Sequence, residues 1–223
     1  MTAVDVVLPC LDEAAALPAV LAGLPVGYRP IVVDNGSRDG SARVAAEHGA
    51  IVLHERRRGY GAAVHAGLAA ATAPVVCVLD CDGSLDPGEL PRLVAPLTAG
   101  AADLVVGRRR PTGRAVWPWH ARAGTAALAA LLRRRGVPVH DIAPARAGYR
   151  EALLALGVTD RAFGYPLELL LRAGLAGWRL LELDVAYRPR AAGTRSKVSG
   201  SVRGTARAAV DLTRVAASLG GRR

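Results

Sequence analysis

The strongest constraint on the fold is a regular alternation of short apolar runs and helix-like segments in the first half of the chain. Five runs are rich in Val, Ile and Leu, which is typical of strands covered by helices on both faces. They are Val4–Leu8, Pro30–Val33, Ile51–His54, Val75–Leu79 and Asp103–Val106. The helix-like segments end at or near Gly or Pro, and they are Glu13–Gly23, Ser41–His48, Tyr60–Ala71 and Gly88–Leu97. This order predicts an α/β fold with a mostly parallel central sheet and right-handed crossovers.

The size of the chain fits one domain. A chain of 223 residues, 51% of them hydrophobic, can bury a substantial core without a second folding unit. There is no internal repeat or low-complexity linker, although the sequence changes character after Gly107. We therefore expect a single domain, residues 1–223, in which the second half covers a crevice formed by the first.

Acidic residues and glycines gather where the predicted strands end. They are Asp12 and Glu13 after the first strand, Asp34, Asn35 and Gly36 after the second, and Asp80, Asp82 and Gly83 after the fourth. Ligands of parallel α/β sheets bind beyond the carboxyl ends of the strands. One crevice at that edge of the sheet is therefore the predicted binding site.

The segment Asp80-Cys-Asp-Gly-Ser84 has the properties of a metal site. Carboxylates two residues apart in an extended segment point to the same side, and carboxylate oxygens suit Mg²⁺ or Mn²⁺, whose coordination substrate phosphates and water can complete. The structural alternative is that Asp82 and Ser84 are turn and helix-cap residues before Pro87.

Two further loops carry candidate ligand contacts. Asp34 can accept hydrogen bonds from the N–H edge of a nucleobase, whereas Ser37 and Asp39 can equally be caps of the next helix. In the first loop, Asp12 or Glu13 is either a ribose ligand or an acid that favours the start of a helix.

The segment Arg58-Gly-Tyr-Gly61 precedes a predicted helix. Glycines permit close backbone approach to a ligand, and the N-terminus of a helix stabilises anions. The segment is not a dinucleotide fingerprint, because Val64 stands where the third glycine of GxGxxG would be.

Five motifs, in this order and spacing, resemble family 2 glycosyltransferases with the GT-A fold, particularly the branch of dolichol- and polyprenyl-phosphate sugar synthases. They are PCLDE, VVDNGSRDGS, GYGAAVHAG, LDCDGS and DLVVGRR. The resemblance continues through Asp141–Arg146, Phe163–Glu168 and Tyr187–Ser199. It implies an inverting, metal-dependent transferase that uses a UDP- or GDP-linked sugar. Residues 1–107 would bind the nucleotide sugar and residues 108–223 the acceptor.

The resemblance also implies roles for individual residues. Pro9 and Glu13 match positions that contact the nucleoside, and Asp34 matches the acid that reads the base. Arg58 and Gly59 lie where the loop of the family meets the nucleotide.

Asp80 and Asp82 match the metal-binding pair of the family, and Asp82 is expected to be the direct ligand. Arg190, Ser196 and Lys197 match a basic loop that closes over phosphate groups, so Arg190 and Lys197 are candidates to stabilise the leaving diphosphate.

The sequence also departs from the family pattern. Asn35 replaces a common second acid, Pro144 and Ala145 stand where some members carry an acid and an aromatic residue, and no transmembrane tail is present.

The acceptor is the least constrained part of the prediction. A hydroxyl acceptor needs a carboxylate within about 2.6–3.2 Å to take its proton, and Asp141 and Glu168 are the candidates. Glu168 can instead pair with Arg172 four residues later. A polyprenyl phosphate needs no base, because a phosphate monoester is already ionised near neutral pH. This acceptor would be reached at the cytoplasmic face of an anionic membrane through a basic loop and a final amphipathic helix, Arg203–Leu219.

The composition narrows the alternatives. A net charge of +10 implies an anionic partner, but basic residues interleaved with aromatics are lacking, so no nucleic acid is expected. A nucleotidyltransferase would carry a Gly-rich basic loop directly after the first strand. This sequence has PCLDEAAALP there, which argues against that class of enzyme. Three cysteines without CxxC spacing, no signal peptide and no apolar run of about 20 residues favour a cytoplasmic protein, for which a peripheral contact with the cytoplasmic face of the membrane is open.

Overall fold

The computed structural model describes residues 2–113, 116–142 and 144–191. The strands are β1 Val4–Cys10, β2 Tyr28–Asp34, β3 Ile51–His54, β4 Val75–Val78, β5 Leu104–Pro111, β6 Ala145–Tyr149 and β7 Leu180–Tyr187. The helices are α1 Leu17–Ala22, α2 Ser41–Glu47, α3 Tyr60–Ala70, α4 Leu90–Thr98, α5 Trp119–Arg134, α6 Arg150–Ala155 and α7 Tyr165–Leu175, with a short 3-10 helix over Pro87–Glu89.

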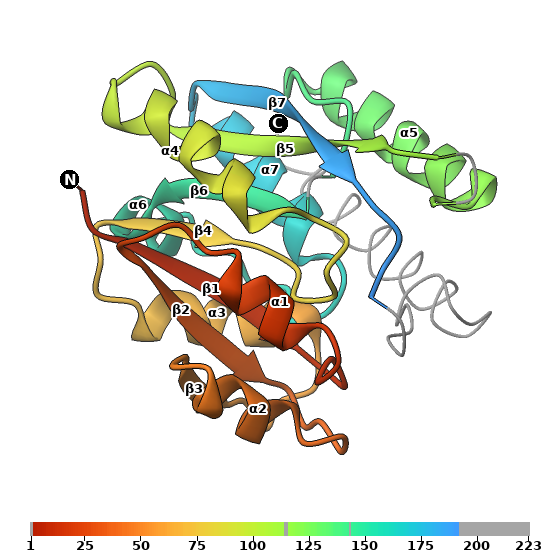
Figure 1. Cartoon of the computed structure of the whole chain (residues 1–223). Helices are drawn as coiled ribbons and strands as arrows, with labels where there is room; N and C mark the ends of the chain where they lie inside the picture. Colours follow the sequence, from red (N-terminus) through yellow and green to blue (C-terminus); the bar gives the residue numbers. More distant parts are fainter. Residues whose placement is uncertain (1, 114–115, 143, 192–223) are drawn as a thin grey trace.

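The seven strands form one sheet in the order β3-β2-β1-β4-β6-β5-β7 (Figure 1). β6 runs antiparallel to its neighbours β4 and β5, and the other neighbouring pairs are parallel. The predicted α/β class and mostly parallel sheet are therefore confirmed. The sheet brings the carboxyl ends of β1, β2 and β4 to one edge, where the crevice was predicted.

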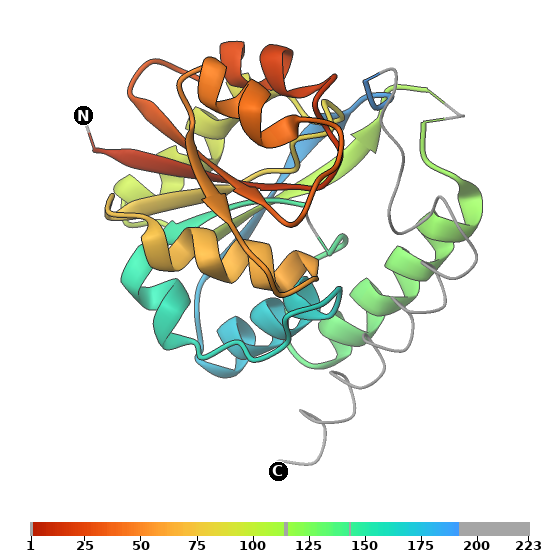
Figure 2. The ribbon, with the colours of Figure 1, turned by 90° about the horizontal axis from the view of Figure 1, so that it is seen from below.

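Two apolar layers enclose the sheet. Buried side chains of α1, α2 and α4 pack on one face, and those of α3, α5, α6 and α7 pack on the other. Figure 2 shows the sheet between α1 and α2 on one side and α3, α6 and α7 on the other. Helices on both faces explain why β4 is apolar without alternation: its four residues are all buried.

The first helix starts later than the sequence predicts, at Leu17 rather than Glu13. The amides of Asp12, Glu13 and Ala14 donate to side chains of the loop after β2. These bonds hold the first loop in a non-helical conformation, in which Asp12 has a positive φ of 53°.

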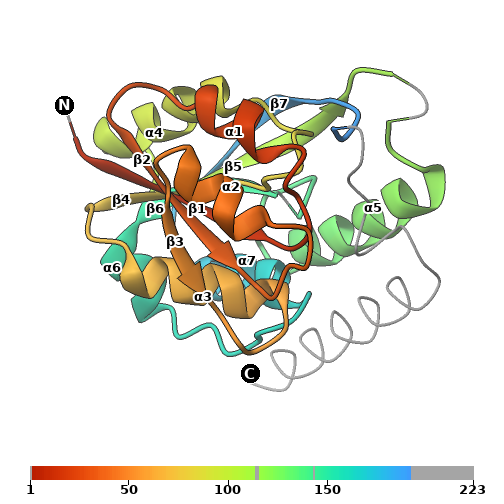
Figure 3. The same cartoon turned by 60° about the horizontal axis from the view of Figure 1, so that its bottom comes forward.

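Helix α5 lies beyond the end of β5 (Figure 3). Of its 16 residues only Ala129 and Leu132 are buried, and Trp119 at its start is 80% exposed. The first half of α5 is therefore held against the domain only loosely by side-chain packing.

Candidate functional site

The Asp80–Ser84 loop extends the line of β4 at the carboxyl edge of the sheet. Leu79 continues the ladder by donating its amide to Val7. Asp82 is buried, and its two carboxylate oxygens have different partners: Oδ1 accepts the Ser84 amide at 2.9 Å, and Oδ2 meets Arg190 Nη1 at 2.5 Å. The turn contact proposed as the structural alternative is thus present, and it leaves one oxygen of Asp82 facing a cation.

Asp80 has several charged side chains around it. Burial and the neighbouring charge of Asp82 raise the pKa of Asp80 to about 6, against the opposing effect of Arg190, Arg146 and Arg109. Two adjacent carboxylates that repel each other are stabilised by a bound cation. No group of three or more His, Cys, Asp or Glu side chains suited to a metal occurs among the described residues. The two carboxylates of Asp80 and Asp82 fit a hard divalent ion that takes its remaining ligands from phosphate and water.

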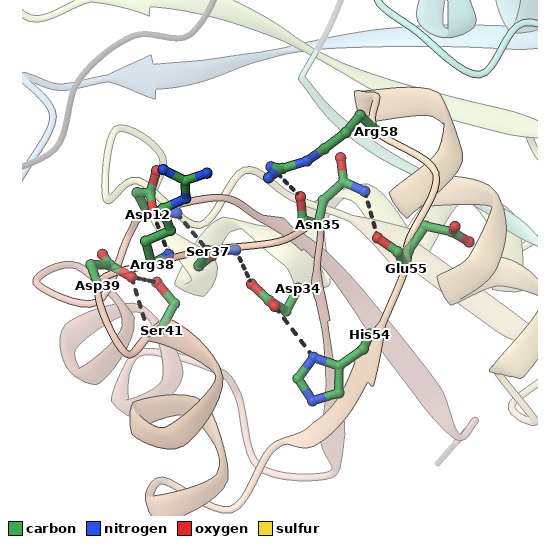
Figure 4. A network of polar contacts seen from close by, with 10 residues as sticks. All are labelled: Asp12, Asp34, Asn35, Ser37, Arg38, Asp39, Ser41, His54, Glu55 and Arg58. Atoms are coloured by element: carbon green, nitrogen blue, oxygen red, sulfur yellow. Dashed lines mark hydrogen bonds and ion pairs between the residues drawn. The ribbon is translucent and has the colours of Figure 1, made fainter.

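Asp34 ends β2 with a buried carboxylate (Figure 4). Oδ1 accepts the Ser37 amide at 3.0 Å, and Oδ2 lies 3.3 Å from Nδ1 of His54 at the end of β3. Burial raises the pKa of Asp34, but the bonds from Ser37 and the neighbouring His54 outweigh it and leave the pKa lowered. Asp34 is thus ionised at neutral pH, as an acceptor for a nucleobase N–H must be.

Hydrogen bonds join the loop after β1 to the loop after β2, with backbone amides of the first as donors and side chains of the second as acceptors. Ser37 Oγ accepts the Asp12 amide, Asp39 Oδ2 accepts the Ala14 amide, and Asp39 Oδ1 accepts both the amide and the hydroxyl of Ser41. Ser37 and Asp39 therefore bridge the two loops (Figure 4), whereas the N-cap of α2 is Gly40, without a side-chain cap hydrogen bond.

Glu13 and Pro9 are the two candidate nucleoside contacts in and next to the first loop. Glu13 is buried at 6% exposure, and its amide donates to Ser41 Oγ. Pro9 is a residue of β1 whose carbonyl accepts from the Cys81 thiol of the metal-site loop. Both lie at or just after the carboxyl end of β1, and their contact with a nucleoside stays a prediction.

Asn35 organises the loop that carries Arg58 and Gly59. Its side-chain amide donates to the carbonyls of Glu55 and Arg57, and its Oδ1 accepts the Gly59 amide at 2.8 Å. Arg58 in turn donates to the Asn35 carbonyl at 2.7 Å. Asn35, where an acid is common in the family, thus fixes the loop of residues 55–59 by hydrogen bonds. An acid could not replace it, because a carboxylate lacks the two N–H donors of an amide.

The glycines at the start of α3 pack closely against another segment of the chain, and contact of Arg58 and Gly59 with a nucleotide stays a prediction. A side chain at Gly59 would come within 2.1 Å of the Arg161 carbonyl oxygen, and one at Gly61 within 2.7 Å of Tyr165. The amides of Gly61 and Ala62 donate to carbonyls of residues 161–162. The glycines therefore admit another segment of the protein, and these N–H groups are not free to bind an anion.

Asp141 is buried and forms an ion pair with Arg109. Oδ2 accepts the backbone amide and Nε of Arg109, and Oδ1 accepts Nη2 of Arg109 and the amide of Ile142, at 2.7–2.9 Å. Burial raises the pKa of Asp141, but the bonds and charge of Arg109 outweigh it and lower the pKa. Four donors occupy the four lone-pair positions of the carboxylate, so Asp141 is not placed to take a proton.

Glu168 also accepts four hydrogen bonds, three at Oε1 and one at Oε2. Its oxygens accept the amides of Thr159 and Asp160, the Thr159 hydroxyl and Arg172 Nε. The predicted pair with Arg172 is confirmed, at 2.6 Å. Both carboxylates considered as general bases therefore stabilise local structure.

A basic cavity lies between the end of β5 and the start of α5. It has a volume of about 400 Å³ and is lined by Arg108, Arg109, Arg110, Pro111, Trp117, Trp119, Arg122, Ala123, Thr125, Ala126, His140 and Asp141. The Arg109 guanidinium stacks 3.9 Å from the centroid of the Trp117 ring and 5.5 Å from that of Tyr187. Tyr187 also forms an isolated β-bridge with Leu85, the residue after the metal-site loop, so the cavity lies near that loop.

Sequence analysis did not identify this cavity. Its signals were the Arg108–Arg110 run and the neighbouring Trp117 and Trp119, but nothing in their spacing indicates that a helix folds back over them. Ser196 and Lys197, together with the predicted loop and final helix, lie outside the described residues.

Comparisons with known proteins support the resemblance. The model of the family "Glycosyl transferase family 2" matches residues 5–156. An uncharacterized glycosyltransferase of Mycobacterium tuberculosis is 61% identical over 96% of this chain and 97% of its own length. A dolichyl-phosphate hexose transferase of Haloferax volcanii is 33% identical over 85% of each chain.

Among solved structures, glucosyl-3-phosphoglycerate synthase from Mycobacterium tuberculosis, in complex with Mn²⁺, UDP and glucosyl-3-phosphoglycerate, is similar in fold. The TM-score is 0.78 at 25% identity, covering 100% of this chain and 81% of that one.

Proposed function

The chain belongs to family 2 of the glycosyltransferases, and from that premise we propose that it transfers a sugar, with inversion, from a nucleoside-diphosphate sugar to a polyprenyl phosphate. The observation that carries the choice of acceptor is the basic, tryptophan-lined cavity near the metal-site loop. Residues 1–107 would bind the donor and residues 108–223 the acceptor.

The donor would bind along the carboxyl edge of the sheet. Asp34 would accept an N–H of the base, with Pro9 and Glu13 near the nucleoside, and Asp80 and Asp82 would hold Mg²⁺ or Mn²⁺. When bound, that ion supplies Lewis-acid stabilisation of the leaving diphosphate. The similar synthase was crystallised with Mn²⁺ and UDP, which supports this assignment.

The contacts of the two candidate bases favour an acceptor that is already ionised. All four hydrogen bonds of Asp141 and of Glu168 are made within the protein. A phosphate monoester, whose second pKa is about 6, carries its own nucleophilic oxygen at neutral pH. The cationic side chains around the cavity, with Arg109 held in place by Asp141, suit such a phosphate.

The rest of the acceptor would be apolar and would reach the cavity from a membrane. Trp119 lines the cavity and is largely exposed, and Arg110 and Arg122 line the same cavity. This combination of aromatic and basic groups suits the interface of an anionic bilayer. No helix within the described part of the chain is long and apolar enough to span a membrane. The proposed contact is therefore peripheral, at the cytoplasmic face.

A smaller anionic acceptor is the second candidate. The similar synthase has been crystallised with phosphoglyceric acid, which combines a phosphate with a hydroxyl group. Such a molecule would use the same basic cavity and would need a base for its hydroxyl.

Transfer of labelled sugar from UDP- and GDP-sugars tests both candidates, with a short polyprenyl phosphate and 3-phosphoglycerate as acceptors. We expect transfer to the polyprenyl phosphate, lost in Asp82→Ala. Arg122→Gln should raise the KM for that acceptor several-fold, whereas Arg134→Gln, at the other end of α5, should not. Transfer to 3-phosphoglycerate alone would contradict the lipid acceptor, and full activity of Asp82→Ala would contradict the metal site.

A further inference from the structure

Arg190 forms an ion pair with the carboxylate expected to bind the metal. Its Nη1 lies 2.5 Å from Asp82 Oδ2, and the side chains of Arg190 and Asp82 are 30% and 4% exposed. The other oxygen of Asp82 accepts the Ser84 amide. The guanidinium therefore lies against the one oxygen of Asp82 that the loop itself does not use.

The backbone holds Arg190 in this place. The Ala191 amide donates to the Asp82 carbonyl at 3.0 Å, and the Arg188 amide donates to the Ser84 carbonyl at 2.8 Å. Gly83, between Asp82 and Ser84, has a φ of +78°, a left-handed conformation that favours glycine, and it lies next to Ala191. The segment after β7 is thus clasped to the metal-site loop on both sides of Arg190.

Arg190 is also the counter-ion of the surrounding acids. Burial lowers the pKa of Arg190, but Asp82, Tyr187, Asp80 and Glu13 outweigh this effect and raise it. The guanidinium is therefore stabilised by the same carboxylates that would attract a divalent cation. Because the guanidinium already occupies Asp82 Oδ2 and its positive charge repels a second cation at the same carboxylate, the two cations compete.

We infer that Arg190 is an ionic gate, which occupies Asp82 until a diphosphate offers it another anionic partner. This inference rests on the metal site of the proposed function. A metal ion alone must displace Arg190 without compensation, whereas a metal ion arriving with a nucleoside diphosphate provides phosphate oxygens to which the guanidinium transfers. Arg190 thereby makes metal affinity depend on the nucleotide, and after the exchange its charge lies beside the leaving group.

The gate predicts a coupling between metal and nucleotide that the charge of Arg190 sets. Coupling between two ligands is commonly about 5- to 150-fold in affinity, and it is reciprocal. Replacing Arg190 by Gln leaves Asp82 without a competing cation, so Mn²⁺ alone should bind more tightly, by roughly tenfold within that range. The effect of UDP or GDP on Mn²⁺ affinity should shrink correspondingly.

Mn²⁺ binding, followed by the electron paramagnetic resonance signal of free Mn²⁺, tests the gate without acceptor or turnover. The wild type, Arg190→Gln and Arg188→Gln are titrated with MnCl₂ alone and with UDP or GDP present. Arg188→Gln is the matched control. It removes the same charge two residues before Arg190, and Arg188 pairs with Asp86 instead of Asp82. Thermal unfolding establishes that each variant is folded.

Tighter binding of Mn²⁺ alone to Arg190→Gln, but not to Arg188→Gln, is the expected result. Unchanged or weaker binding to Arg190→Gln, or equal effects in both variants, would overturn the gate while leaving the proposed transferase intact. If none of the proteins binds Mn²⁺ even with UDP or GDP, both the gate and the metal part of the proposed function fall.

Discussion

Replacing Asp141 by Asn distinguishes an anchor from a general base. The carboxylate accepts four hydrogen bonds, three of them from Arg109. Asn keeps one acceptor oxygen and turns an NH₂ group toward the guanidinium, so Arg109 loses its counter-ion while only 17% of its side chain is exposed. Breaking a buried ion pair on one side costs about 3–5 kcal/mol. In a chain of this size roughly 2–4 °C of melting temperature is lost per kcal/mol, so we expect a fall of ~6–20 °C.

The matched control is Asp184→Asn. Asp184 pairs with Arg110, the next arginine of β5, but both side chains are about half exposed, at 54% and 52%. An exposed pair contributes only about 0–1 kcal/mol, so this control should melt within a few degrees of the wild type.

The pH dependence of stability gives a second readout for Asp141. Its pKa is lowered in the folded protein, so its contribution is complete above the ordinary value of 3.8 and is lost as the pH falls below it. Asp141→Asn should lack this part of the acid-induced destabilisation. A variant that melts like the wild type yet loses 10²- to 10⁴-fold in turnover, the usual range for a general base, would refute the anchor.

Two further predictions follow from the geometry. Asp34→Ala should weaken UDP or GDP binding by a similar factor with and without Mn²⁺, because its carboxylate would contact the base; equal affinity in a calorimetric titration would remove Asp34 from the site. Gly61→Ala should destabilise the protein by about 1–3 kcal/mol in urea unfolding, since the new methyl group would lie 2.7 Å from Tyr165. Gly124→Ala, in an open position of α5, should be neutral or stabilising, and equal effects of the two would contradict the packing argument.

The sheet could be predicted because local signals and tertiary structure agree there. Val75–Val78 is apolar at every position, since helices cover both faces of β4, and the acids that follow it come at the end of the strand. The parallel register of β1 with β2 and β4 then brings the loops together. The α1 boundary was missed, because side chains more than 20 residues away hold the first loop out of a helix.

The acceptor side could not be predicted in the same way. The three bonds between Asp141 and Arg109 join residues 32 positions apart, and they exist because β6 inserts antiparallel between β4 and β5. Sequence gives no period or spacing for such a contact. The packing role of Gly59 could not be predicted for a related reason, since the carbonyl that leaves no room for a side chain there belongs to Arg161, about 100 residues later in the chain.

The neighbouring strands β5 and β7 connect the two parts of the proposed site. Pro111 at the end of β5 is in register with Tyr187 at the end of β7, and the Tyr187 ring lies 5.5 Å from the Arg109 guanidinium that lines the cavity. Three residues after Tyr187, Arg190 is held on Asp82. A shift of Arg190 from Asp82 to a diphosphate would therefore act on the end of β7, which is in contact with the acceptor cavity through Tyr187. On this geometry, donor binding and acceptor binding should depend on each other even though their ligands contact different strands.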